Sequence, residues 1–144
     1  IVFMNPDTEF NGDALFKNCT GLEKAVLPAN LESIGYNMFN GCSSLSSITI
    51  PNNVTIIYDY AFCGTGIVEI TIPASVKEIW KNVFENCENL TSITFAKPDG
   101  WRVYGFGDRT GTEKDLSDPF NNVALFKQYS PSSSSLRYTW RNLT

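Results

Sequence analysis

The sequence contains no histidine among its 144 residues. Histidine is the commonest general base and a frequent metal ligand, so its absence weakens any proposal of acid–base catalysis or of a metal site. Positive charge is also scarce, because 11 Lys and Arg face 15 Asp and Glu and the formal net charge is −4. Nucleic-acid binding relies on basic side chains that neutralise phosphates. We therefore expect no nucleic-acid partner.

Long apolar runs are absent too, and none approaches the roughly 18 residues that a membrane-spanning helix needs. No two of the four cysteines form a Cys-x-x-Cys pair, which argues against structural zinc. No signal peptide is recognisable and the first residue is not Met, so we interpret the sequence as a mature or excised piece of a longer chain. With 42% hydrophobic and 18% charged residues, the composition fits one soluble domain that is not inserted in a membrane.

A pattern of 22–23 residues repeats along the chain. The repeating unit reads Leu-x-x-Ile-x-Ile-Pro-x-x-Val-x-x-Ile-x-x-x-x-Phe-x-x-Cys-x-x. Leu-x-x-Ile-x-Ile at a fixed period of about 20–29 residues is typical of a leucine-rich-repeat solenoid. The phenylalanines that mark the period are Phe16, Phe39, Phe62 and Phe84.

The repeats extend over residues 1–95. A single unit buries too little apolar surface to offset the conformational entropy that it loses on folding. The units must therefore stack on one another. One unit is a residue short, which we attribute to a tight turn at Cys63–Gly66. The predicted organisation is a partial unit 1–21, full units 22–44, 45–66 and 67–89, and a partial unit 90–95.

Within each unit, Ile-x-Ile alternation predicts a short strand that the proline ends. Val-x-x-Ile predicts a second extended segment. Phe-x-x-Cys has the spacing of one helical turn, which would bury both side chains. We therefore predict a right-handed α/β leucine-rich-repeat solenoid of short strands and single-turn helices, followed by a C-terminal β-rich cap.

The stretches Ile34–Leu45 and Ile48–Pro51 resemble the BspA-like leucine-rich repeats, also called the Treponema pallidum type. These repeats occur in bacterial surface proteins and some protist surface antigens, and the resemblance covers residues 10–104. It implies an extracellular or cell-surface protein that adheres to host or neighbouring-cell partners and has no catalytic activity.

Residues 96–144 depart from the repeat, and we predict that they cap the last unit. Asp118 and Pro119 are suited to begin a short helix that runs to about Tyr129. Leu136–Trp140 alternates like a closing strand. The expected core of the cap is Trp101, Val103, Tyr138 and Trp140.

The cysteine column is interpreted as small apolar side chains stacked in the core, with Cys63 out of register and partly exposed. Gly105–Gly111 superficially resembles a phosphate loop, but its spacing is wrong. Asp115–Asp118 lacks the full spacing of a calcium loop. We expect no enzyme activity, no cofactor and no metal.

Two exposed features are candidate binding sites. Successive rungs of a stack lie about 4.8 Å apart, so Tyr58 and Trp80 are expected side by side, with Tyr36 near them. Exposed aromatic residues are enriched in interfaces, although such a cluster can also merely cover the edge of the core. The second feature is a pair of exposed rows on the strand face, and threonine's preference for strands also explains the row that contains Thr49, Thr71 and Thr94. Its candidate residues are Ser47, Thr49, Glu69, Thr71 and Thr94.

The sequence thus predicts a non-catalytic module that binds a protein partner, either a host matrix protein or a cell-surface protein. Two alternatives stay open. One is a structural spacer in a longer surface protein. The other is a glycan-binding module, for which Tyr58 and Trp80 should be coplanar and face solvent.

Overall fold

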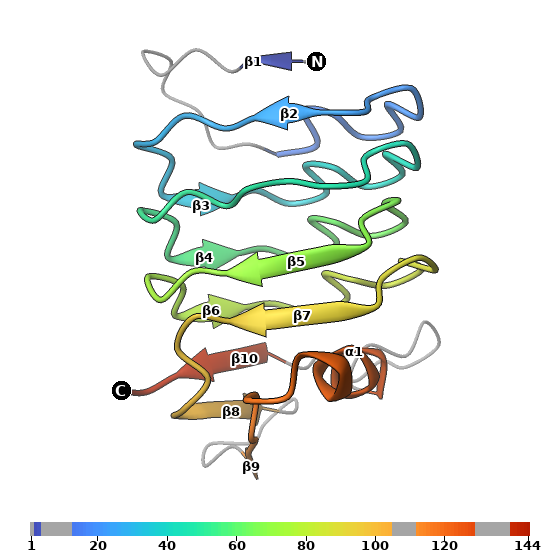
Figure 1. The fold of residues 1–144 in the computed structure, drawn as a ribbon. Helices are drawn as coiled ribbons and strands as arrows, with labels where there is room; N and C mark the ends of the chain where they lie inside the picture. The colour runs from blue at the N-terminus through green and yellow to red at the C-terminus, as the bar shows by residue number, and fades with distance from the viewer. Residues whose placement is uncertain (1, 4–12, 105–111, 129–138) are drawn as a thin grey trace.

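The computed structural model describes residues 2–3, 13–104, 112–128 and 139–144, and it is a stack of flat rungs with the two chain ends at opposite ends of the stack (Figure 1). Short strands lie on two sides of each rung, and hydrogen-bonded turns close a third side. The elements are β1 (Val2–Phe3), β2 (Ala25–Val26), β3 (Ser33–Ile34), β4 (Ile56–Ile57), β5 (Glu69–Ile72), β6 (Glu78–Ile79), β7 (Ser92–Phe95), β8 (Trp101–Tyr104), β9 (Thr112–Glu113), α1 (Pro119–Gln128) and β10 (Thr139–Asn142).

Parallel pairing follows the period of the sequence repeat. On one side of the stack β3, β4 and β6 are neighbours, and Ile34, Ile57 and Ile79 lie opposite one another. On the other side β1 pairs with β2 and β5 pairs with β7. Each repeat therefore contributes one layer, which confirms that the repeats stack.

The strand predicted at Ile48–Ile50 is not formed as a paired strand. This segment lies in the rung between β2 and β5 without ladder pairing, and the N–H of Val68 donates to the carbonyl of Ser46 at 3.2 Å just before it. The β1–β2 pair and the β5–β7 pair are thus separate two-stranded sheets, whereas β3, β4 and β6 belong to one continuous sheet.

The Phe-x-x-Cys segments form consecutive turns, not the predicted single-turn helices. Around each phenylalanine, the residues two before it and two after it have positive φ, a conformation that Gly and Asn adopt more readily than other residues. Backbone hydrogen bonds join successive turns, such as that from the N–H of Phe39 to the carbonyl of Ala61 at 2.8 Å. The two columns with positive φ are Ala14, Asn37, Tyr60 and Asn82, and Asn18, Gly41, Gly64 and Asn86.

The core is organised around the phenylalanine column. Adjacent rings stack with centroids 5.3–5.9 Å apart and nearly parallel planes. Cys42 and Cys87 are buried beside this column, and their thiols donate to the carbonyls of Phe16 and Phe62 at 3.0 Å. The cysteine column is therefore part of the packed core at Cys42 and Cys87, whereas Cys19 in the first unit is exposed. In the shortened unit Thr65 replaces the cysteine.

Two expectations about the thiols are wrong, those for Cys63 and Cys19. Cys63 is buried, although we predicted that it would be partly exposed, and the exposed thiol is that of Cys19. The turn that shortens the unit draws Cys63 inward. Gly64 has a φ of +65°, and a Cβ on Gly66 would lie 2.3 Å from the carbonyl oxygen of Ser43. Glycine at these positions permits the close approach that the 22-residue step requires.

The C-terminal segment ends the parallel ladder by inserting a strand of opposite direction. β10 lies between β6 and β8 and is antiparallel to both. Helix α1 covers the end of β7, begins at the predicted Pro119 and ends one residue before the predicted Tyr129. The predicted core residues Trp101 and Trp140 are buried. The side chain of Val103 and all of Tyr138 lie outside the described residues.

Candidate interaction surfaces

Tyr36, Tyr58 and Trp80 form the first candidate, which we name the aromatic surface. Tyr58 follows the buried Ile57 of β4, and Trp80 follows the buried Ile79 of β6. Their ring centroids lie 5.1 Å apart, so the two side chains are neighbours as the repeat predicts. Their planes meet at 63°, however, so the rings are not coplanar.

Tyr36 joins this surface because its rung has no side chain in the aromatic column. Gly35 occupies that position, and the ring of Tyr36, one residue later, stacks on Tyr58 at 4.6 Å. The same ring contacts Trp80 edge-on at 5.9 Å. All three rings are partly exposed. The cluster therefore spans three successive rungs and keeps contact with solvent.

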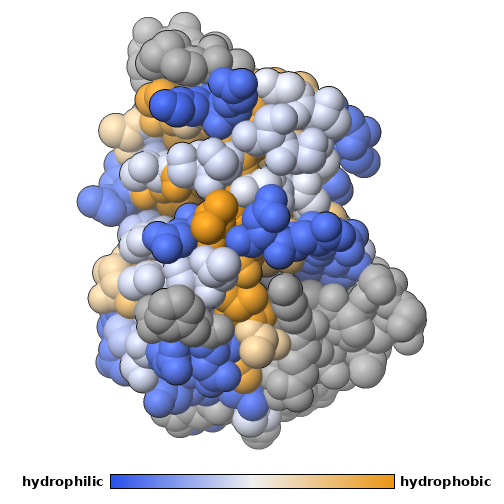
Figure 2. Space-filling model, turned by 45° about the vertical axis from the view of Figure 1, so that its right-hand side comes forward, coloured by the Kyte–Doolittle hydropathy of each residue, from blue (hydrophilic) through white to orange (hydrophobic). Residues whose placement is uncertain are grey.

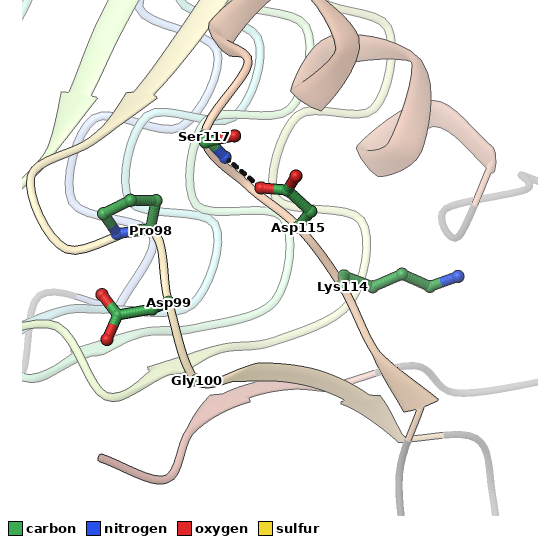
Figure 3. A pocket seen from close by; sticks show the side chains of 6 residues that line it. All are labelled: Pro98, Asp99, Gly100, Lys114, Asp115 and Ser117. Atoms are coloured by element: carbon green, nitrogen blue, oxygen red, sulfur yellow. Dashed lines mark hydrogen bonds between the residues drawn. The ribbon is translucent and has the colours of Figure 1, made fainter.

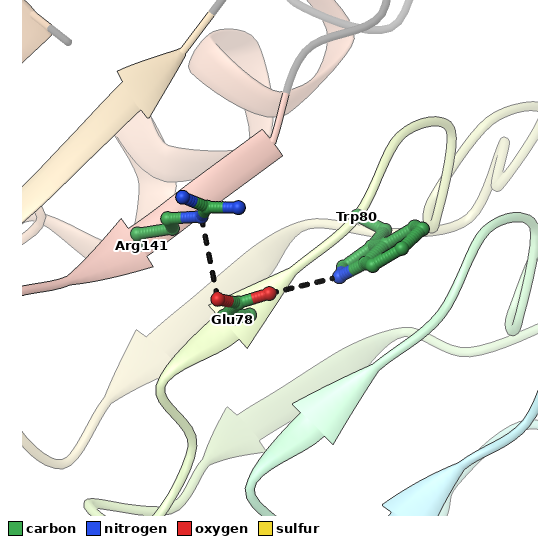
Figure 4. Close-up of polar contacts among 3 residues, drawn as sticks. All are labelled: Glu78, Trp80 and Arg141. Atoms are coloured by element: carbon green, nitrogen blue, oxygen red, sulfur yellow. Dashed lines mark hydrogen bonds and ion pairs between the residues drawn. The ribbon is translucent and has the colours of Figure 1, made fainter. Parts of the chain in front are cut away.

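Acidic groups border the aromatic surface. The indole N–H of Trp80 donates to a Glu78 oxygen at 3.1 Å, and the other Glu78 oxygen lies 3.3 Å from Nε of Arg141 (Figure 4). Asp13 accepts a hydrogen bond from the N–H of Tyr36 at 3.0 Å. Burial raises the pKa of the Tyr36 hydroxyl, and the negative charge of Asp59 raises it further. That hydroxyl therefore stays protonated at neutral pH and can donate a hydrogen bond.

The strand face is the second candidate. Alternation along β5 buries Ile70 and Ile72 and turns Glu69 and Thr71 outward. Thr71 lies directly opposite Thr94 of β7. The residues predicted for this face are all exposed, namely Ser47, Thr49, Glu69, Thr71 and Thr94.

A groove of about 600 Å³ crosses part of this face. It spans three successive rungs and contains two of the predicted residues, Thr49 and Thr71. Its lining includes neither a charged residue nor an aromatic one. The residues around it are Ile48, Thr49, Ile50, Asn52, Thr71, Pro73, Ala74, Ser75 and Ala96.

Apolar side chains are dispersed on the face seen in Figure 2, where hydrophobic colour forms narrow strips between polar groups. Among the described residues, the large hydrophobic side chains that are exposed include Val26 at 48% and Val68 at 42%. They lie in different columns of the repeat. This face therefore offers no broad apolar patch of the kind that marks a large hydrophobic interface.

Another concavity, of about 360 Å³, lies in the C-terminal segment and is lined in part by Asp99, Lys114 and Asp115 (Figure 3). Hydrogen bonds from the Ser117 hydroxyl and from the Ser117 N–H, the latter at 2.9 Å, lower the pKa of the Asp115 carboxyl group. Within the described residues, no group of three or more cysteine and acidic side chains converges as a metal site would require. In the same residues, no helix is long and apolar enough to cross a bilayer.

Sequence reasoning missed Glu78 and Arg141 as neighbours of Trp80. Glu78 precedes Trp80 by two residues, and alternation alone indicates that their side chains lie on the same side. The contact with Arg141 depends on the position of β10, for which the repeat gives no signal.

Comparison with known proteins supports the fold. Residues 11–102 match the model of the BspA type leucine rich repeat region in six copies. A solved leucine-rich repeat protein from Bacteroides ovatus is 36% identical, with a TM-score of 0.56, and the match covers 57% of this chain and 21% of that one. A leucine rich cell surface protein from Faecalibacterium prausnitzii is 31% identical, with a TM-score of 0.62, over 74% of this chain and 29% of that one. The chain thus spans less than a third of either protein, and no curated protein matches it.

Proposed function

Because the chain belongs to the BspA-type leucine-rich repeat family, we propose that it is a non-catalytic module of a bacterial cell surface that binds a protein partner through the aromatic surface. The similar chain from Faecalibacterium prausnitzii is described as a cell surface protein, which supports this location. The partner is a host matrix protein or a protein on a neighbouring cell.

One observation carries the proposal. Rings from three successive rungs converge outside the core while remaining partly exposed. The buried isoleucines of β3, β4 and β6 already fill the interior at these rungs, so the core alone does not require the rings. Aromatic residues that combine a large apolar area with a polar group are favoured at protein interfaces.

The geometry favours a protein over a glycan. Sugars stack on flat aromatic faces, but Tyr58 and Trp80 meet at 63° and Tyr36 and Trp80 at 88°. Such an angled cluster suits the irregular side chains of a protein partner.

The groove on the strand face favours a second candidate site. It combines the exposed hydroxyls of Thr49 and Thr71 with an apolar lining and carries no charge. A neutral ligand that bridges successive rungs would fit this chemistry. Binding there would require neither Tyr58 nor Trp80.

The test is binding of the protein to an array of matrix proteins, cell-surface proteins and glycans. The double variant Tyr58→Ala, Trp80→Ala removes the aromatic surface, and Thr49→Ala, Thr71→Ala is the matched control on the strand face. Circular dichroism and thermal unfolding verify that both variants fold. We expect a protein hit that only the aromatic variant loses.

Three outcomes overturn the proposal. A hit that only the threonine variant loses moves the site to the groove. Binding to glycans alone replaces the protein partner. No binding by the folded protein favours a structural spacer, with recognition elsewhere in a longer protein.

A further inference from the structure

Strand β10 occupies the place beside β6 that another repeat strand would take. In the sequence, Trp101 of β8 follows Pro98 by three residues, the interval at which Val76 follows Pro73 just before β6. β10 inserts between β6 and β8, and Arg141 lies directly opposite Glu78. A residue of the C-terminal segment therefore reaches the edge of the aromatic surface.

The three side chains form a short polar chain in Figure 4. Nε of Arg141 lies 3.3 Å from one oxygen of Glu78, and the other oxygen accepts the indole N–H of Trp80 at 3.1 Å. Glu78 of β6 and Trp80, which directly follows β6, are two residues apart, so alternation places them on the same side. The carboxylate is thus held from both sides.

We propose that Arg141 is a positioning residue for the aromatic surface: it holds the Glu78 carboxylate where that group fixes the indole of Trp80 against Tyr58. The biological meaning of this inference rests on the proposed function, whereas the geometry stands without it. The C-terminal segment then completes a binding surface whose rings all come from the repeats.

The exposure of the Arg141 and Glu78 side chains indicates that their ion pair positions the indole and contributes little to folding. The Arg141 side chain is 48% exposed and that of Glu78 is 29% exposed, and ion pairs this accessible contribute little to folding. The attachment of β10 rests instead on the buried Trp140 and on a four-residue ladder with β8. Loss of the guanidinium should therefore release the indole while leaving the strand in place.

Release of the indole from Glu78 would affect the contact between Trp80 and Tyr58. Their edge-on contact places the ring centroids 5.1 Å apart with the planes at 63°, and rotation of the indole would change it. Without the Arg141 guanidinium the Glu78 carboxylate can rotate towards water, since among the described residues it is Arg141 that holds its second oxygen. The indole then loses its acceptor and samples other angles, and a partner must immobilise it on binding.

The test is the indole N–H signal of Trp80 in the ¹H–¹⁵N NMR spectrum of the whole protein. Arg141→Met retains most of the aliphatic side chain but removes the charge. We expect the Trp80 signal to shift and its exchange with water to accelerate. The Trp101 signal is the internal reference, because its N–H donates to the carbonyl of Lys97 at 2.9 Å. Arg141→Lys should restore part of the shift.

The matched control is Arg102→Met, which removes an equal charge from the residue opposite Arg141 on β8. An unmoved Trp80 signal in Arg141→Met would overturn the inference, and so would an equal movement in Arg102→Met. Thermal unfolding separates these results from a general loss of structure.

Binding provides the second readout. With a protein partner from the array, Arg141→Met should weaken affinity about two- to tenfold, the cost of ordering one freed side chain. If the indole signal responds but no partner is found, positioning stands and the proposed function fails. If the aromatic double variant loses binding while the indole signal ignores Arg141, the proposed function stands and positioning fails.

Discussion

The ring of Phe126 stacks on the indole of Trp140, with centroids 4.3 Å apart and planes 15° apart. Phe126 belongs to α1 and Trp140 to β10, so this pair joins two elements of the C-terminal segment. Phe126 also contacts Phe84, the last ring of the phenylalanine column, at 5.6 Å. The repeat stack therefore ends on an aromatic layer, which shields the apolar interior of its last rung from water.

The first prediction concerns this layer. Phe126→Ala should lower the free energy of unfolding by about 3–5 kcal/mol, because it opens a cavity between the last rung and β10. Urea unfolding followed by circular dichroism measures the loss. Ala124→Ser, on an exposed position of the same helix, should change stability by less than about 0.5 kcal/mol. A loss below about 1 kcal/mol for Phe126→Ala would show that the helix does not cover the core as described.

The second prediction concerns Asn122, which is fully buried in α1. Its amide donates to the carbonyl of Ile93 at 2.7 Å and to that of Leu116 at 3.0 Å. Asn122→Ala leaves both carbonyls buried without this donor and should cost about 1–3 kcal/mol. Asn121→Ala, on the exposed neighbour, should cost much less in the same urea experiment. Equal losses in the two variants would contradict a specific role for the buried amide.

The third prediction concerns Ala14, which has a φ of +53° in a column that otherwise contains Asn37, Tyr60 and Asn82. A Cβ disfavours this conformation, whereas glycine adopts it freely. Ala14→Gly should therefore raise stability by about 0.5–1 kcal/mol. Ala29→Gly, an exposed alanine without positive φ, should lower it. Thermal unfolding of both variants distinguishes relief of strain from a general effect of glycine.

The repeat period was sufficient to predict which residues stack. Ile34, Ile57 and Ile79 are aligned in the parallel ladder because they occupy the same position of the repeat, and successive repeats pair in the same register. The same period predicts that Tyr58 and Trp80 are neighbours. It could not distinguish a helical turn from consecutive turns, because both place residues three apart on one side. The asparagines and glycines at the positive-φ positions were the available signal for turns.

The arrangement of β10 lay beyond what the sequence could predict. Its partners are distant in sequence and belong to a repeat and to the cap, so no local period relates Arg141 to Glu78. The stacking of Tyr36 on Tyr58 is an intermediate case. The glycine at position 35 shows that space is free, but the ring angles depend on packing among all three side chains.

The fourth prediction concerns alkaline pH. Burial raises the pKa of the Cys42 and Cys63 thiols to about 11, above their ordinary range. A thiol whose pKa is higher in the folded protein than in the unfolded chain stabilises the fold while it is protonated. This stabilisation is complete below about pH 9 and is lost as pH rises through about 11. Urea midpoints measured in reducing buffer should fall over that interval. A Cys42→Ala, Cys63→Ala variant should show a shallower fall, and an unchanged slope would contradict the assignment to these thiols.

The last prediction uses two glycines that occupy the same position of the repeat. Gly21 and Gly66 each precede the first apolar residue of a unit, Leu22 and Ile67. A Cβ on Gly66 would lie 2.3 Å from a backbone carbonyl oxygen, whereas a Cβ on Gly21 would meet nothing within 4 Å. Gly66→Ala should therefore cost about 1–3 kcal/mol through overpacking against the preceding rung. Gly21→Ala should be neutral or stabilising by up to about 1 kcal/mol, because alanine restricts the unfolded chain. Since the position is shared, helix or strand propensity cannot explain a difference between the two variants. Equal effects would mean that the 22-residue step does not depend on close approach at Gly66.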